Sequence, residues 1–258
     1  LALSLAATWY AVYALARSPA AQPVAFAFGG EARPADYARA VADGGLLALL
    51  ACLGLARLSH EATPALAQLS FATLLFFALA NLSRKRLIAL CSACFAILGM
   101  ALSGAPALAM ILGVGGALIM ALDAEKPSSL RVRRIDVAWI MLICLACAAV
   151  VSALGLWRWR VNFSQMLEVK SMMRLMLWFT WPAWPLAIWT LWRWRYQLKN
   201  IFANPHLSLP LWFAVVAIGS TLLSGLNDRS LLLALPALAT LAAFALPTLQ
   251  RSVAAFLD

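Results

Sequence analysis

Long apolar runs separated by short polar segments are the dominant pattern of this chain. They cover residues 1–16, 40–58, 63–82, 87–103, 105–122, 137–157, 175–192, 207–226 and 230–249. At ~1.5 Å per helical residue, runs of this length approach or match a bilayer core of about 30 Å. In lipid a helix satisfies every backbone polar group within its own segment. The pattern therefore predicts an all-α fold, a polytopic transmembrane helix bundle of about nine spans that forms a single transmembrane domain over residues 1–258.

The run at 175–192 carries the clearest boundary signal. It holds no charged residue, and beyond it tryptophans alternate with Arg193 and Arg195. Aromatic rings and cations together mark the level at which a helix leaves the membrane. Pro182 and Pro185 lie inside the run and predict a kinked span, since neighbouring groups can satisfy the carbonyls that proline frees. A buried helix of a soluble protein is the alternative, which the recurrence of similar runs disfavours.

Composition and charge agree with a membrane chain. Hydrophobic residues make up 64% of the sequence and charged residues 12%, with a mean hydropathy of +0.87, far from ordinary globular usage. The net charge of +10 does not indicate a nucleic-acid partner, because the basic residues lie in short segments between apolar runs. Fourteen of the twenty fall in alternate segments, around residues 17–39, 84–86, 126–134, 193–199 and at 251. These segments are predicted to face the cytoplasm.

Small features refine this picture. Gly113, Gly115 and Gly116 give the run at 105–122 a small-residue face for close helix packing. The C-x-x-C pairs at residues 91–94 and 144–147 lie in charge-free runs, where a thiolate is unfavourable, so no metal site is expected from them. From Ala35 a helix is expected to carry Asp36 and Asp43 at its water-facing start.

Candidate chemistry gathers in the segments predicted to be external. Only three acids fall there, namely Glu61, Glu168 and Asp228. His60 and Glu61 form a titratable pair before Pro64 at a helix start, and a helix cap is the alternative. The segment 158–174 carries four cations between aromatic residues and predicts an interfacial helix. Its arginines either pair with phosphates or serve only as headgroup anchors.

The order of these features resembles a known family. The features are His60-Glu61-Ala62-Thr63-Pro64 at a span start, the basic turn Ser83-Arg84-Lys85-Arg86, the hairpin Leu102-Ser103-Gly104-Ala105-Pro106, the cluster from Lys126 to Arg134, the span from Trp178 to Arg195, and Leu226-Asn227-Asp228-Arg229. In this order the whole chain resembles the bacterial GT-C glycosyltransferases of the aminoarabinose-transferase and protein-mannosyltransferase type. It departs from them at Ser103-Gly104, where the family has a lysine.

The resemblance implies a GT-C-like fold and an inverting transfer of a sugar from a polyprenyl-phosphate donor. The acceptor would be a lipid or a protein at the external face of the bacterial inner membrane, in the cell envelope, with membrane lipids as further partners. The lipid phosphate would be bound by the external cations Arg229, Arg174, Arg158 and Arg160. The isoprenoid tail would lie against the tryptophan-rich span. No cofactor is certain, and a divalent metal is possible.

The resemblance also assigns catalytic roles. Glu61 and His60 are auxiliary candidates only, because the family's principal carboxylate lies in an external loop that precedes the position of Leu1. The chain is therefore expected to be an internal fragment, truncated at both ends, that lacks the first span and the first external loop. Two other functions stay open. A secondary transporter would place ionisable groups or broken helices near the membrane midplane, and a non-catalytic membrane subunit would explain the missing lysine.

Overall fold

Helices provide all the regular secondary structure in the described part of the chain. The computed structural model describes residues 1–22, 33–122, 130–157, 169–198, 204–223 and 228–249. The elements are α1 (Ala2–Ala16), η1 (Pro19–Ala21), α2 (Pro34–Leu50), α3 (Leu53–Leu58), α4 (Pro64–Asn81), α5 (Arg86–Leu102), α6 (Pro106–Leu122), α7 (Leu130–Ala153), α8 (Val169–Phe179), α9 (Ala183–Arg193), α10 (Pro205–Leu223), α11 (Asp228–Leu231), η4 (Leu232–Ala234) and α12 (Leu235–Ala243). No strand occurs among these residues, so the all-α prediction is confirmed for them.

Four helical stretches within the described residues are long and apolar enough to cross a membrane. They are Pro64–Asn81, Arg134–Ala153, Pro205–Leu223 and Arg229–Leu249, judged by length and composition. The apolar helices α1, α5 and α6 are shorter. These features indicate a membrane protein.

Two of the predicted runs are interrupted helices. The run at 175–192 is divided into α8 and α9, which confirms the predicted kink. The run at 40–58 is divided into α2 and α3, a break that the sequence pattern did not predict. α7 begins at Leu130, so Arg134 lies on a helix and not in the loop expected there. Its long aliphatic stem allows the charge to reach water from a helical position.

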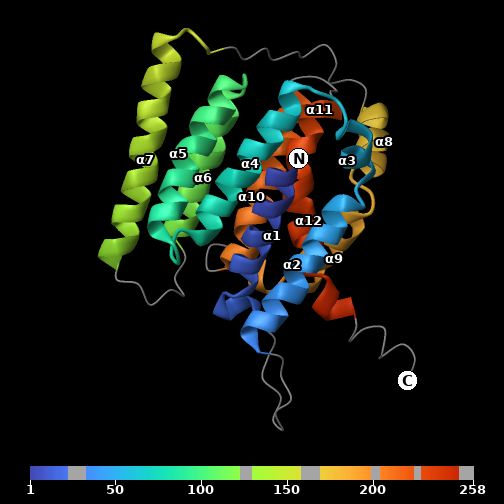
Figure 1. The fold of residues 1–258 in the computed structure, drawn as a ribbon. Helices are drawn as coiled ribbons and strands as arrows, with labels where there is room; N and C mark the ends of the chain where they lie inside the picture. Colours follow the sequence, from blue (N-terminus) through green and yellow to red (C-terminus); the bar gives the residue numbers. More distant parts are fainter. Residues whose placement is uncertain (23–32, 123–129, 158–168, 199–203, 224–227, 250–258) are drawn as a thin grey trace, which may run out of the picture.

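Successive helices run between two ends of the bundle (Figure 1). At one end, the Gln68 side chain at the start of α4 donates to the carbonyl of Ser103 in the α5–α6 turn, at 2.9 Å. At the other end, Arg84 donates to the carbonyl of Arg17 at 2.8 Å. Burial, reinforced by the neighbouring Arg17, lowers the pKa of Arg84. Segments predicted for opposite membrane sides thus lie at opposite ends. We call them the Glu61 end and the Arg84 end.

The core lies around α4, α10 and α12, and α7 packs at the edge of the bundle against α5 and α6 (Figure 1). Small residues allow this close packing. A Cβ atom added at Gly115 would overlap the ring of Trp212, and one at Gly116 would overlap Leu79. The predicted small-residue face of α6 is therefore confirmed.

Candidate functional site

Two interrupted helices meet at their breaks. α2 ends before Cys52, whose extended backbone (φ −64°, ψ 121°) starts α3 in a new direction. α8 ends at Phe179, and Pro182 precedes α9. The backbone N–H of Leu53, at the start of α3, donates to the carbonyl of Trp181 at 3.1 Å. This bond pairs two backbone groups that the helix breaks leave without a partner inside their own helices.

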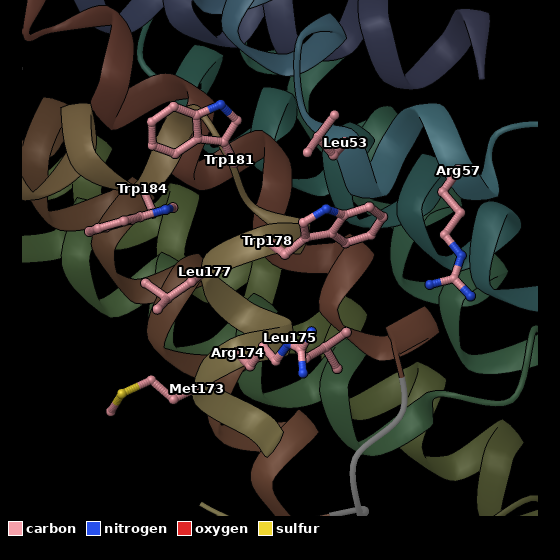
Figure 2. A pocket seen from close by; sticks show the side chains of 9 residues that line it. All are labelled: Leu53, Arg57, Met173, Arg174, Leu175, Leu177, Trp178, Trp181 and Trp184. Atoms are coloured by element: carbon pink, nitrogen blue, oxygen red, sulfur yellow. The ribbon is translucent and has the colours of Figure 1, made fainter. Parts of the chain in front are cut away.

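A groove opens between α3 and α8 beside this junction. Its volume is about 990 Å³, at the upper end of the roughly 300–1,000 Å³ common for ligand pockets. The apolar lining includes Leu53, Leu175, Leu177, Trp178, Trp181 and Trp184 (Figure 2). The charged lining residues are Arg57 and Arg174. We call this the α3–α8 groove.

The charge of the α3–α8 groove is entirely positive among its lining residues. The guanidinium carbon of Arg57 lies 5.9 Å from the centre of the Trp178 ring, a cation–π distance. Figure 2 shows Trp178 in the middle of the lining, with Arg57 on one side of it and Arg174 on another. Both arginines are exposed, and no acidic side chain lines the groove. Chemically, the groove matches a ligand with an apolar body and an anionic group.

Gly54 allows α3 and α8 to pack closely enough to form the groove. A Cβ atom at Gly54 would overlap the ring of Phe179, which is fully buried at the end of α8. Protein interiors are close-packed, so a ring in that position leaves no space for a side chain. The contact between a small residue on α3 and a large one on α8 therefore sets the separation of the two groove walls.

Glu61 and Arg229 form an ion pair at the same end of the bundle. The Arg229 Nη2 lies 3.2 Å from the Glu61 Oε2, with the side chains 51% and 34% exposed, respectively. Two of the candidate site residues are therefore in direct contact. Thr63, not Glu61, occupies the N-cap of α4, and no side-chain bond caps the helix, so the capping alternative fails. His60 is exposed and takes no part in this ion pair.

The ion pair and the groove are neighbours. α11, which carries Arg229, packs against α8, and α8 packs against α3 (Figure 1). Arg174 is brought to the groove, whereas Arg158 and Arg160 lie outside the described residues. The sequence pattern did not single out Arg57 as a site residue. A cation inside the apolar run at 40–58, four residues before Glu61, is the signal that could have identified it.

Metal binding has no support from the described side chains. No group of three or more His, Cys, Asp or Glu residues among them is placed to hold a metal ion. All five cysteines are free.

Comparisons with known proteins give no relative from which to transfer a function. No family model, curated protein or solved structure matches the chain. The geometry of the α3–α8 groove and its surroundings is therefore the basis for a functional assignment.

Proposed function

We propose that this chain is the membrane-embedded part of a glycosyltransferase that uses a polyprenyl-phosphate-linked sugar and acts at the external face of a bacterial inner membrane. One observation carries the proposal. The α3–α8 groove combines an apolar, tryptophan-rich wall with two arginines and lies beside the Glu61–Arg229 pair. An isoprenoid phosphate has the matching chemistry, because its long tail is apolar and its headgroup is anionic.

The proposed topology has nine spans. α2 with α3, α8 with α9, and α11 with η4 and α12 each count as one interrupted span. The remaining spans are α1, α4, α5, α6, α7 and α10. The Glu61 end is proposed to be external, because fourteen of the twenty basic residues fall in the segments assigned to the opposite side.

Different groove residues bind the two parts of the donor. The rings of Trp178, Trp181 and Trp184 hold the isoprenoid tail. On binding, the tail moves from the apolar lipid to the apolar groove wall. Arg57 and Arg174 bind the phosphate, since a planar guanidinium donates two parallel hydrogen bonds to phosphate oxygens.

Arginines also promote the chemistry. An acceptor oxygen attacks the anomeric carbon from the face opposite the phosphate, and the bond from that carbon to the phosphate oxygen breaks. Negative charge grows on the departing phosphate, where Arg174 and Arg229 stabilise it. The acceptor proton passes to a carboxylate. Glu61 is proposed as an auxiliary group that holds Arg229 in place, with His60 next to it in the sequence, and neither is proposed as the principal base.

Lipid binding tests the proposal. The chain in nanodiscs is titrated with polyprenyl phosphate and, separately, with the neutral polyprenol. Arg174→Gln should weaken phosphate binding by roughly 10- to 150-fold, the equivalent of about 1.5–3 kcal/mol for hydrogen bonds to a charged group. Arg195→Gln is the matched control, because Arg195 is likewise an exposed arginine but lies outside the groove, with its guanidinium carbon 5.2 Å from the centre of the Trp192 ring. Equal affinity for the phosphate and the alcohol would contradict the proposal.

A secondary transporter is the second candidate, and one observation favours it. The two interrupted helices are joined at their breaks by the bond from Leu53 to Trp181, and transporters commonly form substrate sites from discontinuous helices. A transporter moves a solute across the membrane, whereas the proposed transferase acts at its external face. Radiolabelled solute accumulating in proteoliposomes, without sugar transfer from the lipid donor, would select the transporter.

A further inference from the structure

Asp43 lies level with the middle of α1 and not at the start of α2. Its Oδ1 accepts a hydrogen bond of 2.7 Å from the indole N–H of Trp9, which is near the middle of α1. α1 has 15 residues, which span roughly 22 Å, less than the bilayer core. A residue level with its middle is therefore at hydrocarbon depth when α1 crosses the membrane. The sequence pattern predicts Asp43 at the water-facing start of a helix, but α2 begins at Pro34, about two and a half turns earlier.

An apolar groove adjoins this carboxylate. It has a volume of about 380 Å³ and is lined by Leu5, Ala6, Trp9, Tyr10, Leu46 and Leu50. Asp43, Leu46 and Leu50 are spaced i, i+3 and i+7, so they share one face of α2. Trp9 belongs both to the lining and to the hydrogen bond with Asp43. We call the combination of this lining and Asp43 the α1–α2 groove.

The charge of Asp43 has no counterpart within the described residues. The ion pairs there join Arg39 to Asp36, Arg86 to Asp136 and Arg229 to Glu61, and none involves Asp43. Its side chain is exposed, so in a membrane the carboxylate would face lipid. An ionised group at that depth is strongly unfavourable without a partner. The single bond from Trp9 satisfies one oxygen but neutralises no charge.

We propose that the α1–α2 groove binds a transmembrane helix of a partner protein that carries a lysine or arginine at the depth of Asp43. Charge complementarity identifies the occupant, because a cation on a helix neutralises the carboxylate while its apolar residues fill the groove. A lipid headgroup lies at the membrane surface and does not reach this depth. A second copy does not fit either. Among its nine apolar runs only that at 40–58 holds a basic residue, Arg57, which lies in the α3–α8 groove near the Glu61 end.

Synthetic peptides test this proposal independently of any transferase activity. Two leucine-rich transmembrane peptides, one with a single lysine near its centre and one with leucine there, are mixed with the labelled chain in vesicles. Energy transfer reports binding. The lysine peptide should bind about 3- to 30-fold more tightly, the range for polar contacts between membrane helices.

Variants of the chain test whether the preference for the lysine peptide arises at the α1–α2 groove. Asp43→Asn should remove the preference for the lysine peptide. Asp36→Asn is the matched control, because Asp36 lies on the first turn of α2 and pairs with Arg39, so the preference should persist. Leu46→Trp fills the groove and should weaken binding of both peptides, which tests the surface even if the Asp43 variant folds poorly. Equal binding of the two peptides to the wild type, or an unchanged preference in Asp43→Asn, overturns the proposal. Self-association of the chain that depends on Asp43 would assign the surface to a second copy and also overturn it.

Discussion

Replacing Gly54 with alanine should separate the walls of the α3–α8 groove. The new Cβ atom would overlap the ring of Phe179, which is fully buried. Either the ring leaves its position or α8 moves away from α3. Both responses alter the groove, because Arg57 lies on α3 and Arg174 lies on α8.

The magnitude follows from two opposing contributions. Alanine in place of a helical glycine stabilises by about 0.5–1 kcal/mol, and overpacking of a filled site costs about 1–3 kcal/mol. Gly219→Ala in α10 provides a matched control, because a Cβ atom there meets nothing within 4 Å. The helical contribution is common to both variants. The free energy of unfolding of Gly54→Ala should therefore be about 1–3 kcal/mol below that of Gly219→Ala.

Reversible unfolding in mixed micelles, followed by circular dichroism, measures this difference. Polyprenyl phosphate binding to the same variants reports on the groove, and Gly54→Ala should bind more weakly than Gly219→Ala. A smaller side chain without a ring should relieve the overlap, so Gly54→Ala combined with Phe179→Leu should lose less stability than the sum of the single changes. Equal stability and equal binding of the two glycine variants would refute the packing argument.

Three further predictions concern the Glu61 end and the topology. A double-mutant cycle between Glu61→Gln and Arg229→Gln should give a coupling of only about 0.2–1 kcal/mol, because both side chains are partly exposed, and a coupling above about 2 kcal/mol would contradict this. In a sugar-transfer assay, Arg229→Ala should lower the rate by roughly 10- to 150-fold and more than Arg229→Lys does, and wild-type turnover in folded protein would remove Arg229 from the phosphate site. After replacement of the native cysteines, single cysteines at Ser83 and Ser103 should be labelled from opposite sides of the membrane, and labelling from one side would contradict the topology.

The helix boundaries that the sequence predicted best are those marked by local signals. Runs at 63–82, 87–103 and 105–122 match α4, α5 and α6 closely, since proline or basic residues begin them. The prolines of the tryptophan-rich run likewise predicted its kink. The break between α2 and α3 has no such signal, because neither proline nor glycine occurs at residues 51–53. It coincides with the bond between Leu53 and Trp181, which are 128 residues apart in the chain.

The candidate site was predictable only in part for the same reason. Charge and helix position placed Glu61, Arg174 and Arg229 at one boundary, and the structure joins Glu61 to Arg229 there. The groove itself is a tertiary feature. It brings Arg57 to Trp178 across two helices whose contact follows from Gly54 and Phe179, which no local pattern predicts.

The most direct test of the central claim is to locate the bound lipid. A polyprenyl phosphate with a photoreactive group on its tail is crosslinked to the chain in nanodiscs, and the adducts are mapped by mass spectrometry. The account predicts adducts on Leu53 and on residues 173–184, which excess unlabelled polyprenyl phosphate suppresses and polyprenol does not. Adducts spread over the exposed face of α7 and insensitive to competition would show only contact with bulk lipid, and would contradict a polyprenyl-phosphate site in the α3–α8 groove.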